Sequence, residues 1–174
     1  MIVPAQAARK STADARFEDL YRSSHQDVFA YVSSLLRDRS LAEDVTATAF
    51  ERAYRRSNSF DPKRGSQRAW LFGIARNAAL DELRRGKRVR ALESEPVAGD
   101  APVVESAEAS IRRAAIGEAM KKLTAREREL VGLKFFAGLK TTEIATVISA
   151  SESATAMRVH RTIEKLRRAC NEAH

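Results

Sequence analysis

The segment at positions 91–110, ALESEPVAGDAPVVESAEAS, constrains the fold of this chain more than any other. It contains five acidic residues and two prolines but no Lys or Arg, and it shows little apolar periodicity. Such a composition cannot bury enough apolar surface to fold alone. We therefore predict a flexible acidic linker at 91–110 that joins two separately folded parts, residues 15–90 and residues 111–174.

The first part, residues 15–90, has the apolar spacing of three helices. In the first helix the apolar residues recur at Phe17, Leu20, Tyr21, Val28, Val32, Leu35 and Leu36. Ser40 and Glu43 form a capping-box pattern, which predicts a second helix over residues 41–56. The turn-rich segment NSFDPKRGS follows. The helical period returns from Gln67 onward, with Gly86 as the predicted C-terminal breaker.

The second part, residues 111–174, contains a pattern typical of DNA-binding proteins. A capping box at Thr124 and Glu127 predicts a helix that ends at Gly138. Two shorter helical patterns follow, TTEIATVIS and SESATAMRVHRTIEKLRRA, and Ser151 is the predicted cap of the second. Two short helices of which the second has a basic outer face indicate a helix-turn-helix. Since no strand pattern competes, the predicted fold is all-α, with two small helical domains.

The composition indicates a polyanionic partner. The formal net charge is +8, from 31 Lys and Arg against 23 Asp and Glu, and cationic side chains gain affinity by releasing counterions from phosphates. The single Cys170 cannot form an intramolecular disulfide, so a reducing cytoplasm fits best. Residues 1–14 lack the apolar core of a signal peptide and are expected to form a flexible extension. No later run approaches a membrane span, so we expect no membrane insertion.

No pattern in the sequence predicts an enzyme. His25, His160 and His174 lie far apart, Cys170 has no Cys or His at metal-ligand spacing, and there is no glycine-rich phosphate loop. We therefore expect no catalytic residue, no metal site and no cofactor. Folding can unite distant residues, so an enzyme that modifies nucleic acid stays open as an alternative. It would need a spatial cluster of titratable groups.

The outer face of the second helix in the helix-turn-helix offers side chains suited to reading DNA. Arg161 can make bidentate contacts to guanine, which are worth about 1–3 kcal/mol of discrimination. Arg158 and Lys165 are better placed to hold phosphates. An ordinary solvated helix is the alternative that these residues alone leave open.

Three blocks in a fixed order carry a resemblance to a known family. They are AEDVTATAFERAYRR, then FDPKRGSQRAWLFGIARNAALDELRR, and after the linker LTARERELVGLKFFAGLKTTEIATVISASESATAMRVHRTIEKLR. Over nearly all of residues 17–168 the chain resembles a bacterial sigma factor of the extracytoplasmic-function (ECF) class. The resemblance implies a factor that performs no catalysis itself, positions RNA polymerase core on promoter DNA and helps to melt the first bases. It also implies weak binding of promoter duplex by the free protein.

The resemblance implies roles for residues of the first part. In the family, the helix that corresponds to 41–56 docks on core polymerase, so Asp44 and Arg52 are expected to bind the core enzyme. The family's common polar pair in mid-helix is replaced here by Ala47 and Thr48. The family's loop before the third helix holds an unstacked base of the melted promoter strand. That role falls on the span from Asn58 to Gln67, and within it on Asn58, Phe60, Asp61, Lys63 and Arg64, while Trp70 is expected to pack behind the loop.

The second part of the family reads the upstream promoter element with its recognition helix, at positions that match Met157, Arg158, His160 and Arg161. Ser149 stands where the family commonly has a turn glycine, and Ala156 replaces a common basic residue. We therefore expect an altered helix-turn-helix angle and an unusual base preference.

Two partners beyond DNA follow from the resemblance, together with one rival interpretation. The acidic linker is expected to thread the active-centre cleft and RNA exit path of polymerase, and an anti-sigma factor is expected to mask both parts. The rival is a conventional helix-turn-helix regulator, which would bind duplex DNA tightly without core polymerase.

Overall fold

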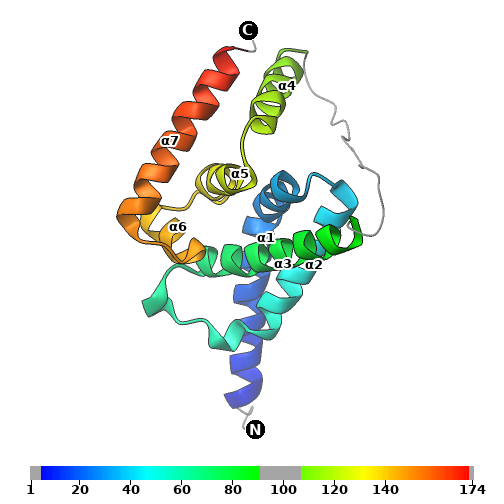
Figure 1. Ribbon diagram of the computed structural model, residues 1–174. Coiled ribbons are helices and arrows are strands. Elements are labelled where there is room, and N and C mark those ends of the chain that lie inside the picture. Colours follow the sequence, from blue (N-terminus) through cyan, green and yellow to red (C-terminus); the bar gives the residue numbers. More distant parts are fainter. Residues whose placement is uncertain (1–4, 91–106, 173–174) are drawn as a thin grey trace.

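The computed structural model describes the backbone at residues 5–90 and 107–172 and the side chains at residues 14–86 and 114–172. Every regular element in these ranges is helical (Figure 1), which confirms the predicted all-α fold. The elements are α1 (Ala5–Leu36), α2 (Arg39–Arg55), η1 (Ser57–Ser59), η2 (Pro62–Arg64), α3 (Gln67–Arg90), α4 (Ala107–Lys121), α5 (Ala125–Val131), the π-helical turn η3 (Gly132–Phe136), α6 (Thr141–Ile148) and α7 (Glu152–Asn171). Residues 91–106 of the predicted linker lie outside the described residues.

Helices α1, α2 and α3 pack against one another and form the first lobe. The apolar stripe predicted for α1 faces its core, where Val28 and Val32 are fully buried. Leu71 and Phe72 of α3 and Ala49 of α2 are buried in the same core. The three helices therefore hold the irregular segment between α2 and α3 on the outside of the lobe (Figure 1).

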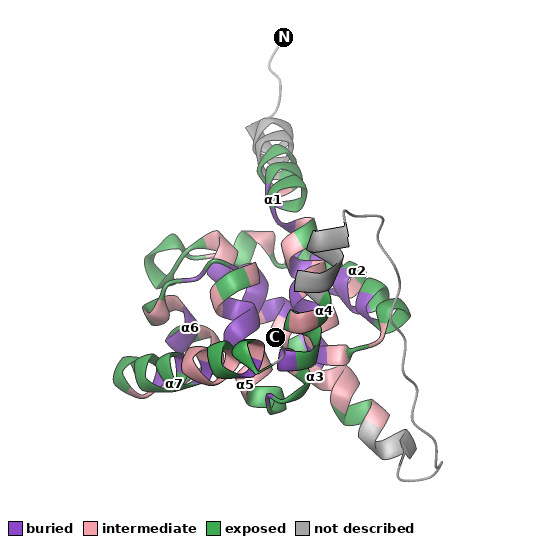
Figure 2. Ribbon diagram, turned by 90° about the horizontal axis from the view of Figure 1, so that it is seen from above, coloured by how far each residue is buried: buried purple, intermediate pink, exposed green. Residues whose placement is uncertain are grey.

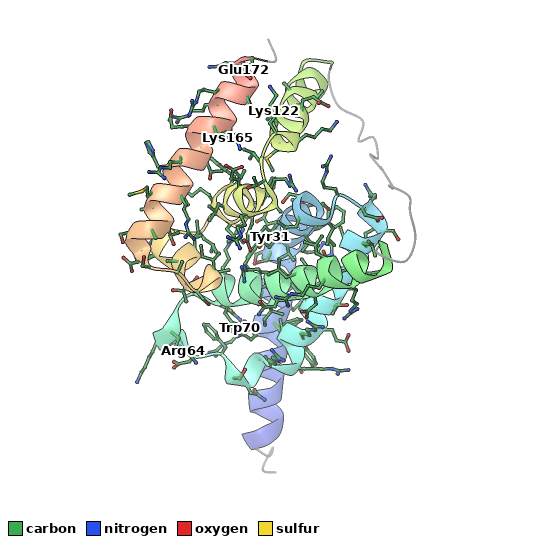
Figure 3. All side chains as sticks on the ribbon, viewed as in Figure 1. Tyr31, Arg64, Trp70, Lys122, Lys165 and Glu172 are labelled. Carbon is green, nitrogen blue, oxygen red and sulfur yellow. The ribbon has the colours of Figure 1, made fainter. Side chains whose placement is uncertain are left out.

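Helices α4 to α7 form the second lobe, in which α7 contacts each of the other three. Thr155 and Val159 of α7 are buried, which places the opposite face of this helix toward solvent. Lys122 and Glu172, which follow α4 and α7 respectively, form an ion pair at 3.0 Å (Figure 3). The lobe starts earlier than the predicted 111: α4 begins at Ala107, because the Ala and Glu of this stretch are strong helix formers.

The start of α2 differs from the prediction. The cap is Asp38, whose side chain accepts a hydrogen bond from the amide of Leu41 at 2.9 Å. The capping box predicted at Ser40 and Glu43 is therefore wrong, and Glu43 instead pairs with Arg39 at 3.1 Å. Asp38 prevails because it already satisfies one of the free amides of the first turn, two residues ahead of Ser40.

Two other helices extend beyond their predicted ends. The predicted break at Gly86 is wrong, since α3 continues to Arg90. A single glycine costs a helix only about 1 kcal/mol, and its neighbours in LRRGKRVR are mostly good helix formers. At the N-terminus, α1 begins at Ala5, so that residues 5–14 are helical rather than irregular.

The two lobes pack against each other and share one hydrophobic core. Helix α5 and η3 lie against α1, and α6 lies against α3. Figure 2 shows the buried residues gathered where these elements meet, and Figure 3 places Tyr31 between the lobes. The approach is close at Gly132, where a Cβ atom would lie 2.6 Å from Cδ2 of Tyr31. The sequence predicts two folded parts but does not predict this packing.

Candidate polymerase and promoter interfaces

The outer face of α2 carries the two residues predicted to bind core polymerase. Asp44 is exposed and makes no ion pair in the described part of the chain. Arg52, two turns further on, is half-buried and lies 3.6 Å from a carboxylate oxygen of Asp81 on α3. Ala47 is exposed between them, and Thr48 is half-buried. The face is therefore accessible, with one free acid and one basic residue that α3 orients.

An aromatic cluster borders this face, and the sequence analysis missed it. The rings of Phe17 and Tyr54 lie 5.1 Å apart, and those of Tyr21 and Phe50 lie 4.8 Å apart, both edge to face. The hydroxyl of Tyr54 donates to Asp14 at 3.1 Å, and this hydrogen bond raises the pKa of Tyr54. Tyr21 and Tyr54 remain 42% and 47% exposed. The spacing of four residues in each helix was the available signal.

The loop predicted to hold a melted base, residues 58–67, has a fixed shape. The side chain of Asp61 accepts from the amide of Lys63 at 2.9 Å, and Pro62 starts the short helix η2. Gly65 has φ of 145°, which favours glycine. The ring of Phe60 lies 5.6 Å from that of Trp70, so Trp70 packs behind the loop as predicted.

The polar residues of this loop point away from the lobe. Asn58, Asp61, Lys63 and Arg64 are all exposed, and Phe60 is half-buried against Trp70. Figure 3 shows Arg64 at the outer edge of the loop. The loop thus combines one aromatic face with a polar and basic rim, which are the two features that a site for an unstacked base needs.

The helix-turn-helix consists of α6, a short turn and α7. Ser149 adopts the left-handed conformation, with φ of 54° and ψ of 50°, so this residue takes the backbone geometry that a glycine would supply. The hydroxyl of Ser151 caps α7 by accepting from the amide of Ala154 at 3.4 Å, which confirms the predicted cap.

All four predicted reading residues on α7 are exposed: Met157, Arg158, His160 and Arg161. Lys165 is different, because its ammonium group bonds Glu127 of α5 at 2.8 Å. That hydrogen bond lowers the pKa of Glu127. Lys165 is therefore engaged within the second lobe rather than free to hold a phosphate. Glu127 also completes the predicted capping box with Thr124.

The loop at 58–67 and the helix-turn-helix lie on the same side of the molecule. Figures 1 and 2 both place the loop next to α6 and the N-terminal end of α7. The described side chains include no group of three His, Cys, Asp or Glu residues that could hold a metal ion. Among the described helices, none has the length and apolar character needed to cross a membrane.

Comparison with known protein families assigns both lobes. The sequence matches Sigma-70 region 2 over residues 20–89 and Sigma-70, region 4 over residues 119–168. It is 30% identical over 140 residues to the ECF RNA polymerase sigma factor SigK of Mycobacterium sp. (strain KMS), which covers 78% of this chain and 72% of the relative. It is 31% identical over 174 residues to the ECF RNA polymerase sigma factor BldN of Streptomyces coelicolor. This alignment covers 97% of this chain and 65% of BldN.

Solved structures show the same fold. The sigma factor RpoE from Bartonella quintana, solved with the anti-sigma factor NepR, has a TM-score of 0.73 and 22% identity, over 90% of this chain and 97% of that one. CnrH, solved with the cytosolic domain of CnrY, has a TM-score of 0.64 and 25% identity, over 95% of each chain.

The order of the two matched regions defines the chain as a protein of the sigma-70 class. Within that class, it belongs to the ECF family of RNA polymerase sigma factors. It is therefore a promoter-specific initiation factor that associates with RNA polymerase, and the rival assignment as a conventional regulator is not favoured. Sigma factors are a non-enzymatic family.

Proposed function

We propose that this sigma factor binds core polymerase, the melted strand and the upstream element through the three separate exposed surfaces described above. The outer face of α2 docks on core polymerase through Asp44 and Arg52. The loop at 58–67 holds one unstacked base of the melted strand, and α7 reads the upstream element. The observation that supports this most directly is that both candidate DNA-binding surfaces are exposed on one side of the molecule.

Base capture is assigned to the loop because its rigid frame and its rim have complementary properties. Extruding a base from the stack costs a few kcal/mol, which an aromatic face and neutralised phosphates can offset. Phe60 supplies the face and is itself held by Trp70. Lys63 and Arg64 neutralise the strand, and Asn58 and Asp61 offer hydrogen-bonding groups to a base edge.

Upstream reading is assigned to α7 by its exposed chemistry. Arg161 suits bidentate contact with guanine, Met157 suits apolar contact with a thymine methyl, and Arg158 suits a phosphate. His160 can donate or accept at a base edge. Since Ala156 takes a position that is commonly basic in the family, one phosphate or base contact should be missing, and the preferred sequence should differ accordingly.

Run-off transcription with reconstituted core polymerase and a library of promoter sequences tests the proposal. Wild-type protein should stimulate transcription from a subset of promoters. Arg161→Ala should relax the preference at one upstream position, and Arg64→Ala should reduce open-complex formation without changing upstream preference. Arg167→Ala is the matched control, because this exposed arginine of α7 pairs with Glu164 and has no proposed contact. An absence of stimulation from every promoter contradicts the proposal.

We also propose that an anti-sigma protein regulates this chain, since the related RpoE was solved with an anti-sigma factor and the related CnrH with a second protein. The exposed aromatic residues Tyr21 and Tyr54 and the basic α7 are the surfaces to be masked. An inhibitor isolated by its affinity for the chain should compete with core polymerase in a pull-down. Simultaneous binding of both partners would rule out masking of α2.

A further inference from the structure

Arg68, in the first turn of α3, joins the two lobes through its guanidinium group. Its Nη2 donates to the carbonyl oxygen of Phe136 at 3.1 Å and to Oδ2 of Asp27 at 2.5 Å, and its Nε donates to the carbonyl oxygen of Ala137. Phe136 and Ala137 stand at the end of η3 in the second lobe. Arg64 is four residues away in sequence and is exposed, whereas Arg68 is held by the second lobe.

Two more donors of the first lobe, Ser66 just before α3 and Arg76 within it, face the second lobe. The hydroxyl of Ser66 donates to Oε1 of Glu143 in α6. Arg76 donates to Oε1 of Glu129 in α5, in a pair whose side chains are only 20% and 12% exposed. In each of these contacts between lobes the donor belongs to the first lobe. The acceptor, a carboxylate or carbonyl oxygen, belongs to the second.

This arrangement of donors suits a nucleic-acid backbone. An arginine guanidinium binds phosphate with the same fork geometry that it uses for carboxylates. Ser66 belongs to the loop at 58–67, and Arg76 lies ten residues further on, about 15 Å along the helix axis. A strand with one base in the loop can therefore continue along the row formed by Ser66, Arg68 and Arg76.

The second-lobe oxygen acceptors that bind Ser66, Arg68 and Arg76 can be replaced by other acceptors. Burying Arg76 with Glu129 requires that both charged groups lose water, and this offsets much of their attraction. The hydroxyl of Tyr31, beside the same pair, is buried without a protein hydrogen-bond partner in the described part of the chain. Such groups regain water when the lobes part. A polyanion that competes for this surface therefore displaces contacts whose burial already costs free energy.

We propose that the row Ser66, Arg68 and Arg76 binds the sugar-phosphate backbone of the melted promoter strand, and that the second lobe occupies this surface in the closed form with its own oxygen acceptors. This inference rests on the proposed role of the loop at 58–67. It makes the second lobe an internal substitute for single-stranded DNA, so that strand binding and lobe closure exclude each other.

The test measures fluorescence anisotropy of a labelled, mixed-sequence single-stranded oligonucleotide with the full chain and without polymerase. The double variant Glu129→Gln, Glu143→Gln weakens these second-lobe contacts and should tighten binding roughly three- to tenfold, because it removes two carboxylates that compete with phosphates. Glu118→Gln combined with Glu172→Gln, at two exposed residues of the second lobe, is the control for the same change in charge. Unchanged affinity in the double variant, with normal thermal unfolding, overturns the proposal.

A second measurement identifies the donor. In the double-variant background, Arg68→Ala should lower the slope of log affinity against log salt by about 0.7, the value for one phosphate contact with a single strand. Arg39→Ala, at the start of α2, should leave the slope unchanged. Arg68→Lys should keep the slope, which shows that Arg68→Ala has not simply unfolded the site. Equal slopes for Arg68→Ala and Arg39→Ala refute the assignment.

A covalent cross-link between the lobes tests whether lobe closure excludes strand binding. In a Cys170→Ser background, Ser66→Cys and Glu143→Cys are joined by a short bis-maleimide, and the same double-cysteine protein blocked with N-ethylmaleimide is the control. The joined protein should bind the oligonucleotide far more weakly than the same protein left unjoined. Equal binding by the joined protein contradicts the proposal, as does an affinity gain limited to duplex DNA in the double variant. Because polymerase is absent, these outcomes are independent of the run-off assay.

Discussion

The contact between Gly132 and Tyr31 allows the packing of the two lobes to be tested by one methyl group. A Cβ atom built on Gly132 lies 2.6 Å from Cδ2, 3.1 Å from Cε2 of Tyr31 and 3.3 Å from Oγ of Ser34. The Tyr31 side chain is fully buried, and its ring packs edge to face on Phe72 at 5.5 Å. The ring therefore has no free space to move into, and Gly132→Ala must push the lobes apart or distort the core.

The size of the effect follows from two opposing terms. Overpacking a well-packed core by a methyl group costs about 1–3 kcal/mol. Gly132 has helical backbone angles, with φ of −60° and ψ of −46°, so the alanine recovers roughly 0.5–1 kcal/mol of backbone entropy. At Gly73, in α3, a Cβ would meet nothing within 4 Å. Gly73→Ala therefore gains the backbone entropy without any overpacking cost. Gly132→Ala should be less stable than Gly73→Ala by about 1–3 kcal/mol.

Urea denaturation of the two variants and of wild type measures this difference. In melting temperature it corresponds to roughly 2–4 °C for each kcal/mol in a chain of this size. A double-mutant cycle with Tyr31→Ala locates the cause: once the ring is gone, Gly132→Ala should lose its penalty and become as favourable as Gly73→Ala. Equal stability of the two alanine variants, or an undiminished penalty without the ring, refutes the reasoning.

Three further predictions concern helix ends and pH. Ser149→Gly should stabilise the second lobe by about 1 kcal/mol, since a left-handed conformation costs a residue with a Cβ roughly that much; urea titration checks it. Thr124→Ala should destabilise by about 1 kcal/mol through loss of its cap bond to the amide of Glu127, and a stability equal to wild type would contradict this. The hydrogen bond from Lys165 holds the pKa of Glu127 below its ordinary value of 4.5, so its contribution is complete at neutral pH and is lost as the pH falls below that value. Glu127→Gln should flatten the acid side of the stability curve, and an unchanged slope between about pH 5 and pH 2 counts against the assignment.

Local signals predicted most of the first and second lobes. The period of apolar residues located α1, α2 and α3, and the capping box at Thr124 and the cap at Ser151 fixed the starts of α5 and α7. These features depend on residues within one or two turns of one another, which a sequence reveals directly. Exposure of the predicted reading residues on α7 follows from the same periodicity.

The errors arose where two local signals compete. Asp38 and Ser40 are both good caps, and Arg37, which follows α1 with φ of 57°, decides in favour of the earlier one. Gly86 is a breaker only where no strong helix formers follow it. The position of Lys165 was predicted, but its partner Glu127 lies 38 residues away, and no periodicity reports such a contact.

The stretch FDPKRGSQRAW separates into two groups with opposite surroundings. Lys63 and Arg64 lie on the exposed rim, because Asp61 caps their turn and the Phe60–Trp70 contact fixes the opposite side of the loop against α3. Arg68 is inside the helix and meets the second lobe. Sequence spacing alone gives these basic residues equal chances of reaching DNA, and only the packing of the lobes distinguishes them.

The apolar part of the lobe interface explains why polymerase should be needed for full opening. Leu133 of η3 and Ile144 of α6 are fully buried in the core shared with the first lobe, and exposing such a side chain costs about 1.5–3 kcal/mol. Backbone contacts along Ser66, Arg68 and Arg76 replace only the polar part of that interface. A free chain is then mostly closed, and its affinity for a melted strand is reduced by the fraction that is open. We expect core polymerase to raise this fraction by binding surfaces that the separated lobes expose. Melted-strand affinity should then rise on core binding far less in the Glu129→Gln, Glu143→Gln variant than in wild type.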